Sequence, residues 1–259
     1  MSTPDISLKL PNRVAVISGG SRGIGAAAVR MFVAAGAKVV FNYQNRRDAA
    51  DALVKECGSD KCIAIQADLS TVESGKQLID TAVERFGSCD VVVVNHGIWP
   101  SDDIPVDQMT EAHWRRGMQI NLDSAFGLVK FGVAQMKRQG RGGSVVLVSS
   151  TAGQRGEAFH CDYAAAKGAL ISMVKGLSTE LARDNIRVNC VAPGWVYTDM
   201  AKPALDDPAT REKALRLIPL GRPGTPEEIA APILFLCTEH AGFITGEIFN
   251  VNGGAVLVG

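Results

Sequence analysis

The chain has 259 residues, of which 46% are hydrophobic and 21% charged, so we expect a sizeable core and exclude a disordered chain. Lysine plus arginine and aspartate plus glutamate both total 27, and this zero net charge argues against a nucleic-acid or anionic-membrane partner. No apolar run approaches the roughly 18 residues of a membrane span, and we expect no signal peptide.

Short β-branched runs alternate with longer amphipathic stretches along the chain. This pattern predicts strands in residues 13–20, 37–43, 61–70, 89–97, 143–150, 186–196 and 246–254. It predicts helices in residues 23–36, 46–58, 73–87, 110–139, 162–185 and 225–242. The last helix opens with a capping box, in which Thr225 is the N-cap, Pro226 follows and Glu228 is the third helical residue.

Repeated β–α units of this length predict an α/β fold: a doubly wound, Rossmann-like parallel sheet with helices on both faces, in three α/β/α layers. No linker divides the sequence, so residues 1–259 are expected to form a single domain, with residues 1–12 as a short tail. Residues 198–222 contain three prolines and are expected to be an irregular insertion with short helical pieces. Ligands of such sheets bind beyond the carboxyl ends of the strands.

A glycine-rich loop, "SGGSRGIG" at 18–25, lies between the first predicted strand and helix. Gly19, Gly23 and Gly25 give the spacing G-x-x-x-G-x-G, which permits a tight turn and a close approach of a pyrophosphate to the backbone. The following helix start offers unpaired N–H groups and a favourable dipole. The loop therefore predicts a dinucleotide site, with a plain tight turn as the alternative.

Two later strand ends fit the same ligand. Asp68 can accept a hydrogen bond from an adenine amino group, although a helix-capping role is the alternative. Asn95 and Gly97 end the fourth strand, and the glycine would let the chain pass close to a ribose.

The cysteines show no CxxC pair and no zinc-ligand spacing, so we expect no metal site. We interpret them as reduced, buried thiols of a cytoplasmic protein. They are Cys57, Cys62, Cys89, Cys161, Cys190 and Cys237.

Together these segments resemble the short-chain dehydrogenase/reductase family from Arg13 to about Gly254, closest in pattern to its 3-oxoacyl-[acyl-carrier-protein] reductase branch. The glycine loop has Ser18 in place of the usual threonine, and "VNHG" has His96 where alanine is usual, which would narrow the pocket near the nicotinamide ribose. Further matching segments are "INLDSAF", "VSS", "YAAAK", "APGWVYT" and "NVNGG". The resemblance implies an NAD(P)-dependent oxidoreductase that interconverts a carbonyl and a secondary alcohol.

Tyr163 and Lys167 are four residues apart, so on a helix they project from one face. We expect the Lys167 ammonium, helped by an oxidised nicotinamide, to lower the pKa of Tyr163 toward neutrality, so that the phenol can exchange a proton with the substrate oxygen. Ser150 would hydrogen-bond that oxygen. The resemblance adds Asn121, which would hold a water between Lys167 and solvent. Each residue alone has a bland alternative, a solvated or structural side chain.

The resemblance also implies the cofactor-binding residues, and the segment after Thr198 would form a lid that excludes water. The expected cofactor contacts are Gly19, Ser21, Arg22, Gly23, Ile24, Gly25, Tyr43, Asp68, Leu69, Asn95, Gly97, Tyr163, Lys167, Pro193, Gly194, Val196 and Thr198.

Cofactor preference is set after the second strand, where NAD-preferring relatives usually carry an acidic residue. Tyr43 fills that place, and no acid precedes Asp48. Arg22, with Arg46 or Arg47, could pair with a 2′-phosphate. NADP(H) is therefore the predicted preference, with NAD(H) as the alternative.

The predicted substrate pocket mixes apolar and polar groups, and it suits a 3-oxoacyl thioester, a sugar or polyol, or a cyclic ketone. Its expected residues are Trp99, Ala152, Gln154, Phe159, His160 and Trp195. Lys137, Arg138 and Arg141 could receive an acyl carrier protein. An alternative of another class is a non-catalytic NADP(H)-sensing regulatory protein on the same fold.

A homotetramer is the expected assembly. Helices 110–139 and 162–185 resemble those that form four-helix interfaces in the family. The candidate contacts are Phe126, Val129, Val133, Leu170, Met173 and Leu177, with core packing as the alternative for several of them.

Overall fold

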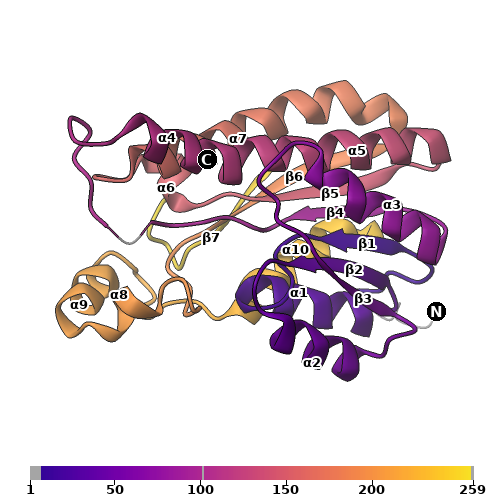
Figure 1. The fold of residues 1–259 in the computed structure, drawn as a ribbon, viewed down its shortest axis with the longest axis horizontal. Helices are drawn as coiled ribbons and strands as arrows, with labels where there is room; N and C mark the ends of the chain where they lie inside the picture. The colour runs from indigo at the N-terminus through magenta and orange to yellow at the C-terminus, as the bar shows by residue number, and fades with distance from the viewer. Residues whose placement is uncertain (1–6, 101, 258–259) are drawn as a thin grey trace, which may run out of the picture.

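Seven parallel strands form one sheet in the order β3-β2-β1-β4-β5-β6-β7 (Figure 1). The computed structural model describes residues 7–100 and 102–257. The strands are β1 (Val14–Ile17), β2 (Lys38–Tyr43), β3 (Cys62–Gln66), β4 (Val91–Val94), β5 (Gly143–Val148), β6 (Ile186–Pro193) and β7 (Ile248–Val251). The doubly wound parallel sheet in a single domain is confirmed, with one strand in each of the predicted segments.

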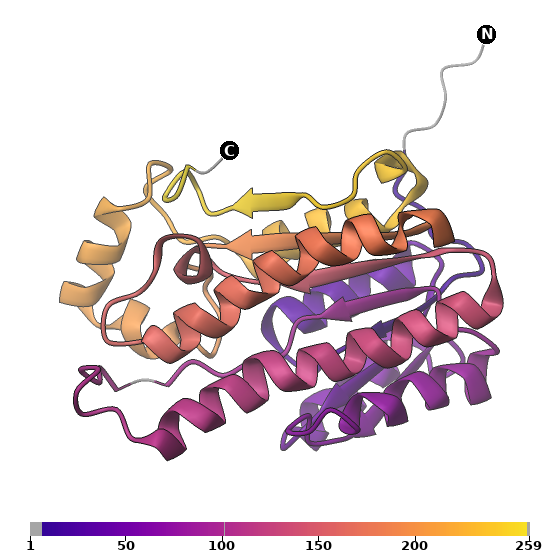
Figure 2. The ribbon, with the colours of Figure 1, turned by 90° about the horizontal axis from the view of Figure 1, so that it is seen from above.

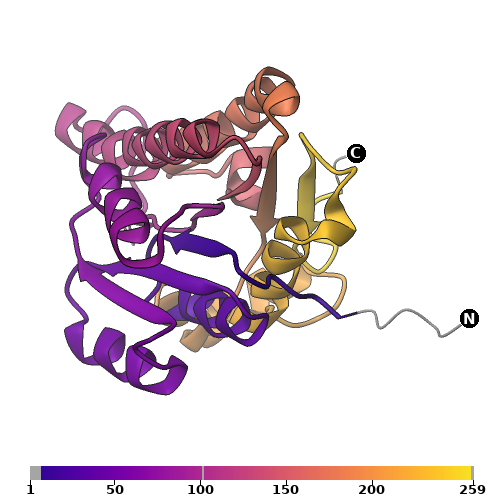
Figure 3. The same cartoon turned by 90° about the vertical axis from the view of Figure 1, so that its right-hand side faces the viewer.

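Helices cover both faces of the sheet (Figures 1 and 3). One face packs against α1 (Gly23–Ala34), α2 (Arg47–Cys57) and α10 (Pro226–Cys237). The other packs against α3 (Ser74–Phe86), α5 (Ser124–Gln139) and α7 (Cys161–Leu181). The residues of β1 are apolar throughout because both faces of the strand are covered. Ala15 and Ile17 pack in the first core, on one face, whereas Val14 and Val16 pack in the second core, on the other.

The predicted helix 110–139 is helical throughout but not regular. It consists of α4 (Glu111–Met118), a π-helical turn (Gln119–Asp123) and α5, which follow one another along one side of the molecule (Figure 2). Thr110 caps α4 by accepting the N–H of His113. The π-helical turn contains Asn121, and such turns are common at functional sites.

The insertion after β6 contains two short helices, α8 (Lys202–Asp206) and α9 (Pro208–Arg216). They lie beyond the carboxyl end of β7, at the same end of the molecule as α4 (Figure 2). Asp207 caps α9 by accepting the N–H of Thr210 at 2.8 Å, and Pro208 follows it. These helices agree with the expected short helical pieces. The other short helices are α6 (Thr151–Arg155), Ala182–Asp184 and Glu239–Ala241.

Part of the expected tail, residues 1–12, packs against the rest of the protein. Leu10 is buried in the first core and donates its N–H to Ala35 O at 2.8 Å, so the chain is anchored before β1 begins. Residues 1–6 lie outside the described part of the chain.

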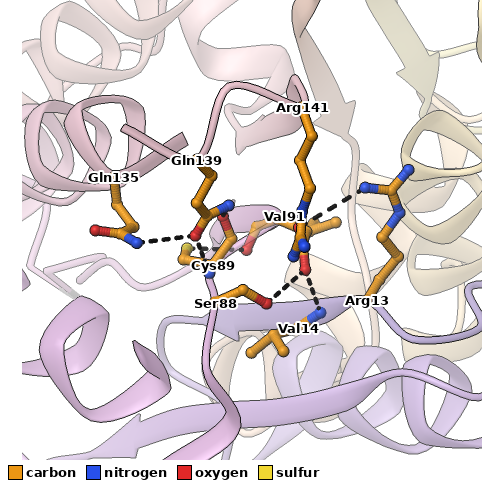
Figure 4. Close-up of polar contacts among 9 residues, drawn as sticks. Arg13, Val14, Ser88, Cys89, Val91, Gln135, Gln139 and Arg141 are labelled. Carbon is orange, nitrogen blue, oxygen red and sulfur yellow. Dashed lines mark hydrogen bonds and ion pairs between the residues drawn. The ribbon is translucent and has the colours of Figure 1, made fainter. Parts of the chain in front are cut away.

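A buried carboxylate, Asp90, ties together the amino ends of β1 and β4. Figure 4 labels its partners Val14, Ser88, Arg141 and Arg13. Its Oδ2 accepts the N–H of Val14 and the hydroxyl of Ser88, both at 2.9 Å. Arg141 donates to Oδ1 at 2.8 and 2.6 Å, and Arg13 lies 3.7 Å from the same oxygen. This cluster lies at the sheet edge opposite the strand carboxyl ends, where it stabilises the fold.

The cations expected to receive an acyl carrier protein have partners within the chain. Arg141 pairs with Asp90, and Lys137 lies 2.8 Å from Asp184. Arg138 donates to Oε1 of Gln135 at 2.6 Å. The six cysteines are free thiols, but Cys57 and Cys161 are half-buried, whereas the other four are buried as expected.

Candidate active site

A cavity of about 540 Å³ opens at the carboxyl ends of the strands, between the glycine loop and the insertion that carries α8 and α9. Nearly all of the predicted cofactor residues line it. They are Gly19, Ser21, Arg22, Gly23, Ile24, Tyr43, Asp68, Leu69, Asn95, Gly97, Tyr163, Lys167, Pro193, Gly194, Val196 and Thr198. Gly25 does not line the cavity, because it packs against the loop itself: a Cβ there would lie 2.1 Å from Gly19 O.

The glycine loop has the geometry of a phosphate cradle. Gly19 and Gly23 have φ values of 65° and 51°, which favour glycine. The N-cap of α1, Arg22, makes no side-chain cap, so the first N–H groups of the helix are free to bind an anion. The residues present therefore fit a dinucleotide pyrophosphate at this helix start.

Asn42 and Asn95 hold the loop in place, and the sequence analysis missed the first of them. Asn42 accepts the N–H of Gly19 at 2.8 Å and donates to Ala67 O at 2.9 Å, which joins β2 to the loop and to the end of β3. Asn95 donates to Ser18 O at 3.1 Å. An asparagine inside a strand gives no sequence signal that its amide will bridge two loops.

The four predicted catalytic residues come together at the carboxyl ends of β4 and β5. Ser150 caps α6 by accepting the N–H of Ala152, and Tyr163 and Lys167 project from α7. Asn121 is 1% exposed and pairs with the backbone of Ile98, accepting its N–H at 2.9 Å and donating to its carbonyl at 3.2 Å.

Gly97 passes directly between these groups. A Cβ at this position would lie 2.7 Å from Oδ1 of Asn121 and 3.3 Å from Nζ of Lys167. The glycine is thus required by close packing against the side chains of Asn121 and Lys167 rather than by its backbone angles.

Burial dominates the proton affinities of the site. It raises the pKa of Tyr163 to about 12, against a hydrogen bond with Ser150 that lowers it, and Glu157 adds to the rise. Burial lowers the pKa of Lys167 to about 8. Without a cofactor the phenol is not acidified: Nζ of Lys167 donates to Val148 O at 2.9 Å, and burial outweighs the hydrogen bond from Ser150. The expected acidification by Lys167 together with an oxidised nicotinamide stays a prediction.

Of the six predicted substrate residues, Trp99, Ala152 and Trp195 line the cavity. Trp99 packs edge-on against Tyr163 with ring centroids 4.7 Å apart. Its ring centroid also lies 4.1 Å from that of His160. The cavity also has lining residues that the sequence analysis did not single out, among them Gln44, Asn45, Arg116, Ile120 and Met200.

The other three predicted substrate residues lie outside the cavity lining. His160 is buried behind Trp99, with Nε2 3.1 Å from Oδ1 of Asp103. Gln154 donates to Oδ1 of Asn250 at 2.6 Å, and Phe159 is 52% exposed. Gln154 lies in α6, and Phe159 and His160 lie in the loop between α6 and α7. The direction of these side chains decides whether they reach the cavity, and sequence order alone does not give it.

The arginines near the expected 2′-phosphate differ in placement. Arg22 and Arg46 line the cavity, whereas Arg47 donates to Oε1 of Gln66 at 3.3 Å. Arg22 also lies 3.7 Å from Asp199, which joins the glycine loop to the start of the insertion.

The described residues, 7–100 and 102–257, contain neither a metal-binding cluster nor a membrane-spanning helix. Within these ranges no group of three or more histidine, cysteine or acidic side chains could hold a metal ion. In the same part of the chain, no helix has the length and apolar character to cross a membrane.

Known proteins resemble this chain along almost its whole length. A family model described as "Enoyl-(Acyl carrier protein) reductase" matches residues 19–256. A 3-oxoacyl-[acyl-carrier-protein] reductase of Synechocystis is 38% identical over 96% of this chain and 98% of its own. An L-rhamnose 1-dehydrogenase (NAD(P)(+)) of Azotobacter vinelandii is 36% identical over 95% of this chain and 97% of its own.

A solved structure agrees with these matches. The crystal structure of a short-chain dehydrogenase/reductase (glucose/ribitol dehydrogenase) from Brucella melitensis superposes with a TM-score of 0.88 at 36% identity, covering 96% of this chain and 99% of that one. The chain therefore belongs to the short-chain dehydrogenase/reductase family, and it is an oxidoreductase that interconverts a carbonyl and an alcohol with an NAD(P)(H) cofactor.

Proposed function

We propose that the protein is an NADP(H)-preferring carbonyl reductase in which Tyr163 is the proton donor. The observation that carries the proposal is the meeting of Tyr163, Ser150 and Lys167 with the glycine loop in one cavity. The sensor alternative has no support, because the relatives named above are described as enzymes.

The cavity lining would hold an NAD(P)H whose nicotinamide would supply the hydride for the carbonyl carbon. Ser150 donates a hydrogen bond to the carbonyl oxygen and keeps it next to the phenol. As the carbonyl π electrons move onto that oxygen, Tyr163 transfers its proton there, which completes the alcohol and leaves a phenolate. The ammonium of Lys167 stabilises the phenolate. Asn121 holds the backbone of Ile98, and the neighbouring Gly97 packs against Nζ of Lys167. In the reverse direction Tyr163 takes the proton back.

Support for NADP(H) comes from charge. Tyr43, Gln44, Asn45 and Arg46 line the cavity after β2, and none of them is acidic. A 2′-phosphate there would meet Arg46, and Arg22 lies in the same lining. Comparing kcat/KM for the two reduced cofactors tests the preference, and equal or better use of NADH would overturn it.

Two substrate classes are supported by the relatives. A 3-oxoacyl thioester fits the match to the Synechocystis reductase, and a sugar fits the match to the rhamnose dehydrogenase. The wall formed by Trp99, Ala152, Trp195 and Met200 is largely apolar, which favours the acyl chain. Spectrophotometry of NADPH oxidation with a 3-oxoacyl thioester, and of NADP⁺ reduction with a panel of sugars, separates the two.

We also propose a cytoplasmic homotetramer that associates through α4, α5 and α7. Phe126 on α5 is 49% exposed and Trp114 on α4 is 38% exposed, so this face offers apolar surface. Two of the expected contacts, Val129 and Leu170, are instead buried in the core and cannot reach a partner. Sedimentation equilibrium tests the assembly, and a monomer at micromolar concentration would refute it.

A further inference from the structure

A histidine after β4 joins two elements of the site. Nδ1 of His96 lies 2.7 Å from Oγ of Ser18, at the end of β1, and Nε2 lies 2.6 Å from Oγ of Ser124, at the start of α5. Both serines are buried, at 0% and 1% exposure. The imidazole therefore bridges the phosphate-binding turn and the helical segment that carries Asn121.

The partners of the two serines determine which ring nitrogen carries the proton. Ser124 donates its hydroxyl proton to Ile120 O at 2.7 Å, so Oγ can only accept from His96, and Nε2 must be the donor. Oγ of Ser18 accepts the N–H groups of Asn95 at 2.9 Å and His96 at 3.2 Å. With both lone pairs used, the Ser18 proton goes to Nδ1.

The neutral ring also fits its electrostatic surroundings. Burial, with a contribution from the Lys167 ammonium, lowers the pKa of His96 to about 3, and the nearby Ile120 carbonyl only partly opposes this. A protonated ring would bring a third donor to Oγ of Ser18 and push the hydroxyl proton to the more distant Val93 O, at 3.3 Å. His96 therefore acts as a fixed hydrogen-bond bridge and not as an acid or base.

The Ser124 contact matters because it lies at the π-helical turn. In such a turn the regular helical pairing is interrupted, and the Ser124 hydroxyl satisfies the carbonyl of Ile120. The next residue is Asn121, whose side chain is held by Ile98. Asn121 is thus fixed by its side chain on one side and by its backbone, through Ser124 and His96, on the other.

The Ser18 contact matters for the phosphate turn. Gly19 packs directly on His96, since a Cβ at Gly19 would lie 3.1 Å from Cα of His96. The two departures from the family pattern, Ser18 and His96, thus contact each other. An alanine in place of His96 has no atom that could make either hydrogen bond.

We propose that His96 is a positioning residue that couples the phosphate-binding turn to the π-helical turn presenting Asn121. One half of the bridge supports cofactor binding and the other half supports the proton-transfer geometry. The proposal rests on the proposed function for its kinetic consequences, but the bridge itself is a property of the protein alone.

Amide replacements separate the two halves of the bridge. In His96→Asn the side-chain oxygen takes the place of Nδ1 and can accept from Ser18, whereas in His96→Gln the amide nitrogen takes the place of Nε2 and can donate to Ser124. We expect His96→Asn to lower kcat about tenfold with an unchanged Kd for NADPH. We expect His96→Gln to weaken NADPH binding about tenfold with kcat nearly unchanged.

Three further variants complete the test. His96→Ala should both lower kcat and weaken NADPH binding. Ser124→Ala should lower kcat and leave the Kd for NADPH unchanged. His240→Ala is the control, because this histidine is exposed and remote from the cavity. Equal effects of the Asn and Gln replacements, or a His96→Ala variant with wild-type kcat and Kd, would overturn the proposal. If His96→Ala fails to fold, the Asn, Gln and Ser124→Ala variants still decide.

Two measurements do not depend on turnover. Two-bond ¹H–¹⁵N correlation spectra of the wild-type protein should show His96 protonated at Nε2 from pH 5 to 9, and an Nδ1-protonated or titrating ring contradicts the bridge. Hydrogen exchange of residues 119–124 should accelerate in Ser124→Ala and His96→Ala but not in His240→Ala. A protein that reduces no carbonyl yet gives these results would refute the proposed function and leave the bridge intact.

Discussion

Nζ of Lys167 lies 5.7 Å from the ring centroid of Tyr163 and donates its hydrogen bond to Val148 O. The lysine is therefore held by the backbone of β5, and burial keeps the phenol protonated. Acidification of Tyr163 needs the positive charge of an oxidised nicotinamide in addition to Lys167. Without a cofactor, Tyr163 is therefore protonated at neutral pH, which is the form needed to donate a proton during carbonyl reduction.

Replacing Lys167 with methionine should raise the free energy of unfolding at pH 7 by about 2 kcal/mol and abolish activity. Burial lowers the pKa of this ammonium from 10.5 to about 8, so below pH 8 the folded protein must bury a charge. Between pH 8 and 10.5 the folded wild type has released a proton that the unfolded chain still holds, so its stability rises with pH.

The advantage of Lys167→Met should accordingly shrink across that interval and vanish near pH 10.5. Urea unfolding of both proteins at pH 7, 9 and 10.5 measures it. If Lys167→Met is less stable than the wild type at pH 7, the buried ammonium does not lower the free energy of unfolding.

Arg141→Ala should destabilise the fold by about 3 kcal/mol, because it leaves the fully buried carboxylate of Asp90 without its closest cation. The matched control is Arg222→Ala, since Arg222 also pairs with a carboxylate through two nitrogens, but both side chains are exposed. That loss should stay below about 1 kcal/mol. Equal losses in denaturant unfolding would mean that burial of Asp90 does not matter.

Arg46→Ala should raise the KM for NADPH about tenfold and leave the KM for NADH unchanged, because only NADPH carries the 2′-phosphate. Arg47→Ala is the matched control, since Arg47 is turned toward Gln66 and does not line the cavity. Initial-rate kinetics with both cofactors distinguish the two positions. The same KM change in both variants would indicate a general charge effect.

Trp99→Ala should expose the ring of Tyr163 to water and bring the pKa of this phenol down from about 12. The alkaline limb of the reduction rate, where the proton donor is lost, should then move to lower pH. Phe159→Ala provides the control, because Phe159 is already half exposed and outside the cavity lining. An unchanged limb in Trp99→Ala would show that the indole does not shield the phenol.

The sequence predicted correctly those features that depend on residues close together in the chain. The capping box of Thr225 and Glu228 forms as predicted, with Pro226 in the first turn. Short β-branched runs between the amphipathic stretches predicted all seven strands of the sheet. The four consecutive valines of β4 are buried on both faces of the sheet. The glycine spacing predicted a tight turn between β1 and α1, and the structure has Gly19 and Gly23 at positive φ there, in the cavity lining.

What the sequence could not supply depends on contacts between distant residues. The π-helical turn at Asn121 is next to the contact between His96 and Ser124, and a helical sequence pattern does not predict such a turn. Gln154 was predicted to line the substrate pocket, but its side chain pairs with Asn250 in β7. The residues near Gln154 in the sequence do not reveal this distant partner. The pKa of Tyr163 likewise follows from burial by the whole fold rather than from its four-residue spacing to Lys167.

The central claim is that Tyr163 donates the proton during carbonyl reduction. Steady-state NADPH oxidation with an accepted carbonyl, together with NADPH binding by fluorescence, should be measured for the wild type and for Tyr163→Phe. The account predicts that kcat falls at least about a hundredfold while the Kd for NADPH stays within about threefold. A phenylalanine variant that binds NADPH and retains wild-type turnover would contradict it.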